Sequence, residues 1–122
     1  MTHQVPILKL GRHLVIAVEG ELTDSGWARV RDDVVRRAAE HRSRGVVVDI
    51  SGMDVMDSYA TRVLDGIAKV LRLRGAETVI VGVHPGVAFA MARLGLRLDS
   101  AGTALDLEEG ILELDRRTAH AP

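Results

Sequence analysis

The 122-residue sequence contains no cysteine and very few aromatic residues. Without thiols it forms no disulfide bond, no thiolate metal site and no cysteine nucleophile. Its aromatic residues are Trp27, Tyr59 and Phe89, which are too few for a surface that stacks on nucleic-acid bases. The formal net charge is -1 and no basic block occurs along the chain, so we expect no nucleic-acid partner.

Long hydrophobic runs are also missing. No apolar run approaches the roughly 18 residues that cross a bilayer, and the first residues have neither the basic nor the apolar part of a signal peptide. These absences predict a cytoplasmic protein with no membrane partner. The composition, with 47% hydrophobic and 27% charged residues, is typical of one globular domain. We expect that domain to span 1–122, with a disordered tail after about residue 116.

The motifs of common enzymes are absent as well. The five histidines are scattered, and the sequence has neither a P-loop nor a dinucleotide-binding glycine motif. Asp49 ends an apolar run, as the phospho-accepting aspartate of a receiver domain does, but the further carboxylates and the lysine of such a site lie elsewhere. We therefore expect a non-enzymatic protein with no catalytic residue, no metal site and no cofactor.

What the sequence does contain is a regular alternation of strand and helix patterns. Strands are predicted at 7–10, 14–18, 46–48 and 78–83 and around 96–98, the first two joined by a hairpin turn at 11–13. Helices are predicted to begin at Thr23 or Asp24, near Ser58, at Pro85 and at Asp106, with Gly45, Gly75 and Gly95 as stops for the first three. This order predicts an α/β fold: a mostly parallel sheet with an antiparallel N-terminal edge strand and about four helices.

The most informative segment is 46–58, where an apolar run ends in Asp49, a compact turn follows, and Asp57-Ser58 opens an amphipathic helix. The free backbone N–H groups and the dipole at a helix start favour added negative charge. Ser58 can therefore be a structural cap, worth about 1 kcal/mol, or a phosphoacceptor that gains roughly -1.5 to -2 charges. A nucleophilic role has little support, because no base accompanies Ser58. From the residues alone the cap and the phosphoacceptor both stay open.

The order of these motifs resembles the STAS domain, the fold of the anti-sigma-factor antagonists. The stretch 48–58 followed by a helix resembles the family signature, and 7–10, 57–60, 63–64 and 104–110 resemble its stressosome branch, the RsbS type. Sporulation-type antagonists usually follow the aspartate with Ser-Ser-Gly, whereas this chain has Ser58-Tyr59-Ala60. That departure favours the stressosome branch.

The resemblance implies a phosphorylation-switched scaffold. It would assemble with RsbR-type STAS sensor proteins, as a dimer and then a large hetero-oligomer, and hold an RsbT-type switch serine kinase. Phosphorylation of Ser58 would release the kinase, and an RsbX-type phosphatase would reset the site. The alternative is a free anti-sigma-factor antagonist that binds an anti-sigma kinase directly.

The acid-rich turn before Ser58 is interpreted as the edge of the docking surface, and Asp49 as a structural anchor of that turn. The residues that we expect to contact a partner are Asp54, Met56, Asp57, Tyr59 and Thr61.

Overall fold

The computed structural model describes residues 5–119 and contains one five-stranded sheet with strand order β1-β2-β3-β4-β5. The elements follow in the order β1 (Ile7–Leu10), β2 (His13–Glu19), α1 (Asp24–His41), β3 (Gly45–Gly52), α2 (Ser58–Leu73), β4 (Glu77–Val81), α3 (Pro85–Arg93), β5 (Gly102–Ala104) and α4 (Leu107–Thr118). Strands β1 and β2 form an antiparallel hairpin, and every other pair is parallel. The predicted α/β class is confirmed. Within the described residues, no helix is long and apolar enough to cross a membrane.

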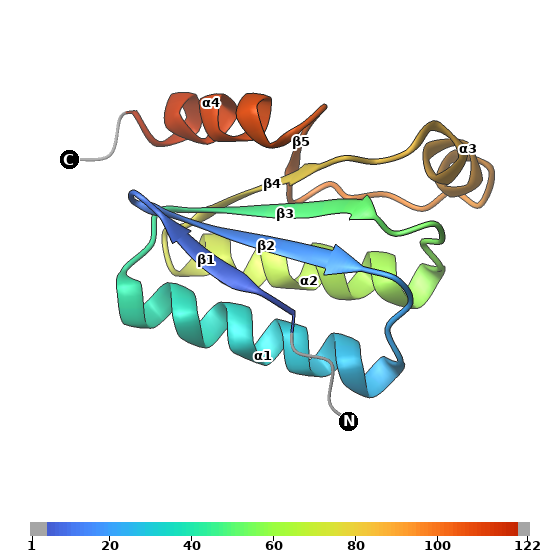
Figure 1. Ribbon diagram of the computed structural model, residues 1–122, viewed down its shortest axis with the longest axis horizontal. Helices are drawn as coiled ribbons and strands as arrows, with labels where there is room; N and C mark the ends of the chain where they lie inside the picture. Colours follow the sequence, from blue (N-terminus) through green and yellow to red (C-terminus); the bar gives the residue numbers. More distant parts are fainter. Residues whose placement is uncertain (1–4, 120–122) are drawn as a thin grey trace.

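The sheet lies between two helical layers (Figure 1). Helices α1 and α2 cover one face, and α4 covers the other, against β3, β4 and β5. The apolar positions of α1 recur at helical spacing, and all four are buried: Trp27, Val30, Val34 and Ala38. Strand β3 contributes to both faces because its residues are apolar on alternate sides, with Val46 and Val48 in the larger core and Val47 in the smaller one.

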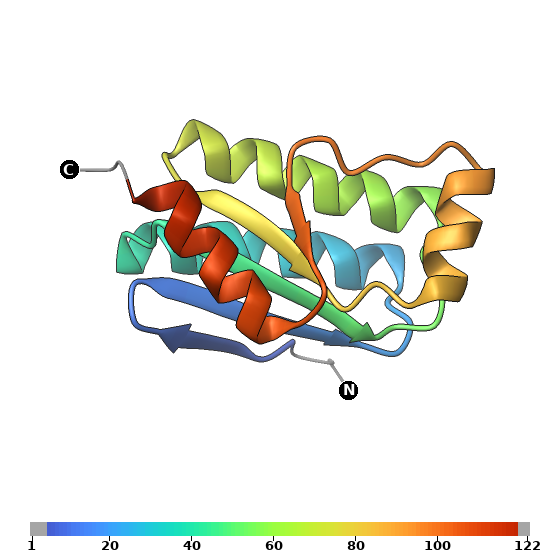
Figure 2. The ribbon, with the colours of Figure 1, turned by 90° about the horizontal axis from the view of Figure 1, so that it is seen from above.

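Parallel pairing brings the loops after the strands together at one edge of the sheet. Seen from above, β2, β3 and β4 run in the same direction, and α3 lies beyond the end of β3 (Figure 2). The loops that follow β2, β3 and β4 therefore meet at the carboxyl edge, which is where ligands and partners commonly bind in open α/β sheets. The loop that leads into α2 at Ser58 is one of them.

Three details differ from the sequence-based expectations. The fifth strand is Gly102–Ala104 and not a segment around 96–98. Leu96 and Leu98 lie in a loop, and their strand-like spacing arises because both side chains pack against the core. Helix α1 ends at His41 through Arg42, in the left-handed region at φ 50°, and not through Gly45. Gly45 begins β3 instead, where a Cβ atom would lie 2.6 Å from Nδ1 of His13.

The end of the chain is ordered further than expected. Helix α4 continues to Thr118, and Arg117 forms ion pairs with Glu77 and Glu113. The predicted boundary near residue 116 therefore comes too early for 117–119, and the rest of the expected tail, 120–122, lies outside the described residues.

Candidate functional site

The loop between β3 and α2 is anchored by two methionines. Met53 and Met56 are buried in the core at 2% and 4% exposure, whereas Asp54 and Val55, between them, face outward. The backbone N–H of Met53 also donates to the carbonyl of Ile50 at 3.0 Å, which closes the turn. The loop is thus held from beneath and presents an acidic and an apolar side chain at its surface.

Asp57, and not Ser58, caps helix α2. Its backbone is extended (φ -89°, ψ 179°), and Oδ1 accepts a hydrogen bond from the backbone N–H of Ala60 at 2.8 Å. Its carbonyl oxygen accepts from both the backbone N–H and the hydroxyl of Thr61, at 3.0 and 2.9 Å. The sequence left open whether Ser58 is the cap, and the structure assigns that role to its neighbour.

Ser58 is therefore the first residue of the helix, with an exposed side chain. Among the residues that the structure describes, its hydroxyl has no hydrogen-bond partner. The first turn of α2 contains no acidic residue, so only the Asp57 cap offsets the positive end of the helix dipole. A hydroxyl in this position can be modified without removing the cap.

The base of the loop rests on the junction between β4 and α3. Asp49 accepts a hydrogen bond from the N–H of Ser51 at 2.9 Å, which confirms it as an anchor of the turn. Nε2 of His84 lies 2.5 Å from the carbonyl oxygen of Ser51. Gly82 passes so close that a Cβ atom there would lie 2.7 Å from Cβ of Ser51 and 3.0 Å from Oδ1 of Asp49.

Sequence analysis missed His84 and Gly82 as supports of this loop. The segment that contains them was regarded as an ordinary turn, because it has no phosphate-binding pattern. The available signal was topological: the end of a strand parallel to β3 must lie beside the loop that follows β3. These two residues connect α3 to the candidate site.

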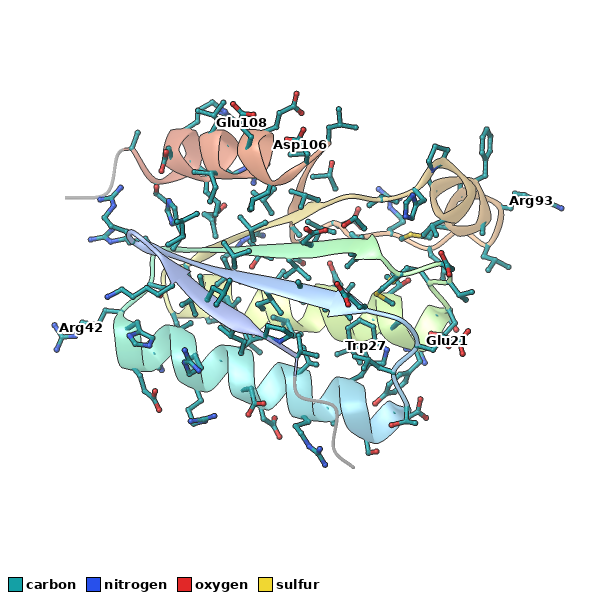
Figure 3. All side chains as sticks on the ribbon, in the orientation of Figure 1. Glu21, Trp27, Arg42, Arg93, Asp106 and Glu108 are labelled. Carbon is teal, nitrogen blue, oxygen red and sulfur yellow. The ribbon has the colours of Figure 1, made fainter. Side chains whose placement is uncertain are left out.

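A second loop adds acidic side chains to the same edge. Glu19 pairs with Gly52 across the ends of β2 and β3, and the hydroxyl of Tyr59 lies 3.5 Å from the carbonyl oxygen of Asp24. Five exposed carboxylates that form no ion pair with any described residue gather there, and we call them the acidic rim: Glu19, Glu21, Asp24, Asp54 and Asp57. Figure 3 marks Glu21, in the loop between β2 and α1. The sequence pointed to only two of the five.

The predicted partner-contact residues divide into surface and interior positions. Asp54 and Asp57 are exposed and Tyr59 is half-buried, so all three are accessible at the rim. Met56 and Thr61 are buried, at 4% and 3% exposure, and serve as loop anchor and helix-start support. In this conformation neither side chain is exposed, and their contact with a partner stays a prediction.

No group of three or more His, Asp or Glu side chains suited to a metal ion occurs among residues 5–119. The pKa of the Asp65 carboxyl, in the middle of α2, is lowered from its ordinary value. Burial raises the pKa of Asp65, and hydrogen bonds from Ser100 together with Lys69 outweigh that effect and lower it. The carboxylate of Asp65 accepts a hydrogen bond from the backbone N–H of Ser100 at 2.9 Å. It therefore stabilises the loop before β5 and lies outside the acidic rim.

Comparison with known proteins bears on this arrangement. The STAS domain family matches residues 4–109. The structure resembles that of Moorella thermoacetica RsbS S58E, with 32% identity, a TM-score of 0.82 and coverage of 96% of this chain and 99% of the other. It also resembles a chain from the molecular architecture of the stressosome, described as a signal integration and transduction hub, with 31% identity, a TM-score of 0.75 and coverage of 94% and 99%.

A curated relative is the RsbT co-antagonist protein RsbRA of Bacillus subtilis, 27% identical over 97 residues. The match covers 80% of this chain but 35% of that protein, so the chain spans about a third of the relative's length. The family match over most of the chain and the agreement with RsbS along nearly the whole of it leave one conclusion. The chain belongs to the STAS domain family, and within that family it is RsbS-like.

Proposed function

We propose that this protein is a non-enzymatic stressosome scaffold that holds an RsbT-type switch serine kinase and releases it when Ser58 is phosphorylated. RsbR-type STAS proteins would be its assembly partners, an RsbX-type phosphatase would reset the site, and the complex would act in the cytoplasm. The observation that carries this proposal is the exposed hydroxyl of Ser58, placed first in α2 directly after an independent cap.

The comparisons support the choice of partners. The RsbS structure covers nearly the whole chain, and the Bacillus relative is named as a co-antagonist of RsbT. The solved RsbS is a variant in which glutamate replaces serine, a substitution that imitates part of the charge of a phosphate. For this chain, the kinase, the phosphatase and the sensor proteins are inferences from these likenesses.

The proposed switch is electrostatic. Phosphate would add about -1.5 to -2 charges at Ser58, where the helix start tolerates them, so the fold would persist. The same charge would lie among the carboxylates of the acidic rim and beside Val55 and Tyr59, which offer apolar surface to a docked partner. A docked kinase would then have to bury or face a strongly hydrated dianion, which weakens its attachment.

Phosphorylation in vitro tests the acceptor site. The protein is incubated with an RsbT-type kinase and ATP, and its peptides are mapped by mass spectrometry. We expect phosphate on Ser58 and none on the Ser58→Ala variant. Ser25 is a matched control, because it is also exposed near a helix start, and Ser25→Ala should leave incorporation unchanged. Phosphate found only on Ser25 or on Thr61 would refute the site.

Capture of the kinase tests the consequence. Ser58→Asp should reduce the kinase retained by the immobilised protein, and Ser58→Ala should retain as much as the unaltered chain. Ser43→Asp adds the same charge between α1 and β3, at the opposite edge of the sheet, and should have little effect. Equal capture by the two Ser58 variants would remove the electrostatic argument.

The alternative, a free anti-sigma-factor antagonist, is separated by size. A stressosome component should elute in a very large complex when it is mixed with an RsbR-type protein, whereas a free antagonist should elute as before. The likeness to the anti-sigma factor antagonist SpoIIAA, at 16% identity, concerns the fold alone.

A further inference from the structure

An apolar pocket lies between α3, the loop that follows it and β5, outside the acidic rim. The chain leaves β4, forms α3 and returns through 94–101 to β5 (Figure 2). The pocket that these segments line has a volume of about 560 Å³, which falls in the range of small-molecule sites. Eight of its nine lining side chains are apolar and none is charged.

Helix α3 leaves this space unfilled because the side chains that it turns toward the pocket are small. Only Val87 and Met91 of α3 are buried, and Ala88 and Ala92 line the pocket from positions one helical turn apart. Protein interiors are normally packed closely, so an apolar space of this size is unusual. The unbranched side chain of Met91, which also lines the pocket, can change rotamer to fit an added molecule. The helix thus offers both space and an adaptable wall.

Thr103 supplies the one polar side chain of the lining. Side chains alternate along β5: a Cβ atom at Gly102 would meet the guanidinium of Arg117 on α4, and Ala104 packs against the smaller core on that same face. Thr103 therefore points to the opposite face of the sheet, where the pocket lies. Within the described residues its hydroxyl has no hydrogen-bond partner, so it is free to bond a ligand.

The lining favours a neutral ligand over a charged one, and a small molecule over a helix. A charged group in the pocket would lose water without gaining an opposite charge, because no lining side chain is charged. Two turns of an α-helix, about 10 Å wide and about 11 Å long, occupy about 850 Å³, which is more than the pocket holds. We propose that the pocket binds a neutral, mainly apolar small molecule that carries one hydrogen-bonding group for Thr103.

The pocket is joined to the supports of the loop between β3 and α2. Val83, in its wall, lies between Gly82 and His84, and the N–H of Gly82 donates to the carbonyl of Leu105, another lining residue, at 3.2 Å. A bound molecule should therefore shift the backbone amide resonance of Gly82 together with those of the lining residues. Binding in this pocket requires neither a kinase nor a phosphate on Ser58.

Fluorescence of N-phenyl-1-naphthylamine, a neutral apolar probe, tests the site in the full chain. Its emission should rise, shift to shorter wavelength and saturate at one probe per chain. Ala92→Leu fills the pocket and should weaken probe binding at least about tenfold. Ala90→Leu is the matched control, because Ala90 is an equally exposed position of α3 outside the lining, and it should leave the affinity unchanged. Absence of saturable binding, or equal affinity in the two variants, overturns the proposal.

Displacement of the probe tests the chemistry of the ligand. At about pH 8, 1-octanol should displace it, and octanoate, which has the same chain length and an ionised headgroup, should need at least about tenfold higher concentration. Thr103→Val removes the hydroxyl at nearly constant volume and should lower the affinity for 1-octanol about three- to tenfold. Equal displacement by the alcohol and the carboxylate, or an unchanged 1-octanol affinity in Thr103→Val, refutes the ligand class. Amide shifts on addition of 1-octanol that miss Met91, Thr103 and Gly82 would place the molecule elsewhere and refute the site.

Discussion

Helices α2 and α4 begin with the same device and differ in the turn that follows it. Asp57 and Asp106 both cap through Oδ1, which accepts the N–H of the third helical residue at 2.8 and 2.9 Å. In α4 the first turn then supplies Glu108 and Glu109, and Oε2 of Glu109 accepts the N–H of Leu105 at 3.3 Å. In α2 the first turn has no acid and begins with a free serine hydroxyl.

This difference distinguishes a completed helix start from one that can accept charge. The glutamates of α4 already oppose the positive end of its dipole, whereas α2 relies on its cap alone. The preceding residues differ as well, because Met56 before the α2 cap is buried and Leu105 before the α4 cap is 75% exposed. The backbone at the start of α2 is thus held by a buried side chain, while the Ser58 hydroxyl is exposed and can be modified.

The residues that precede the two caps, Met56 and Leu105, should differ most in their effect on the free energy of unfolding. Met56→Ala should lower the free energy of unfolding by about 2–4 kcal/mol, because it removes a buried side chain and leaves a cavity. Leu105→Ala, at the equivalent place before α4, should change it by less than about 0.5 kcal/mol, because the side chain is exposed. Chemical denaturation monitored by circular dichroism measures both. Similar losses in the two variants would mean that the α2 loop is not specially anchored.

The two capping residues, Asp57 and Asp106, should contribute nearly equally to the free energy of unfolding. Asp57→Ala and Asp106→Ala should each cost about 1 kcal/mol, because each leaves a backbone N–H without its acceptor. Asp57→Asn and Asp106→Asn keep the acceptor and should recover most of the loss, with the same denaturation measurement. If Ser58→Ala instead cost as much as Asp57→Ala, the cap would belong to the serine and the modification argument would weaken.

The sequence predicted the helix start but not which residue caps it. Periodicity located α2 and the buried strand before it, because apolar spacing reflects burial directly. Asp57 and Ser58 are both good caps, and only the backbone conformation at residue 57 distinguishes them. The supports from His84 and Gly82, and the acids of the β2–α1 loop, come from parts of the chain that only the sheet topology brings together. The false strand near Leu98 arose because loop residues can alternate in burial too.

Changing one charge in the first turn should have a smaller effect on stability, and it should distinguish the start of α2 from the start of α4 directly. Ser58→Asp compared with Ser58→Asn should change stability by no more than about 0.5 kcal/mol at low ionic strength, because the dipole's attraction is offset by the nearby rim carboxylates. Glu108→Gln should cost about 0.3–0.5 kcal/mol, because it removes an acid from a start that uses it. A loss above about 1 kcal/mol for Ser58→Asp would show that α2 does not tolerate charge there, which would count against the phosphoacceptor.

The smallest effect concerns the other end of α4, where charges are paired along the helix instead of left open. Hydrogen bonds from Arg116 and Arg117 lower the pKa of Glu113 to about 2, from an ordinary value of 4.5. A carboxyl with a lowered pKa stabilises the fold above its unfolded-state pKa, and this contribution is lost as the pH falls from about 4.5 toward 2.

The stability gap between the unaltered chain and Glu113→Gln should therefore be present at pH 6 and shrink below about pH 4.5, by a small amount because the pair is solvent-exposed. Arg116→Gln with Arg117→Gln removes the donors and should reproduce the loss at neutral pH, with little further change from Glu113→Gln. Urea denaturation at several pH values measures these differences. A gap that stayed constant with pH would mean that Glu113 acts through packing, and α4 would then no longer contrast with the uncompensated start of α2.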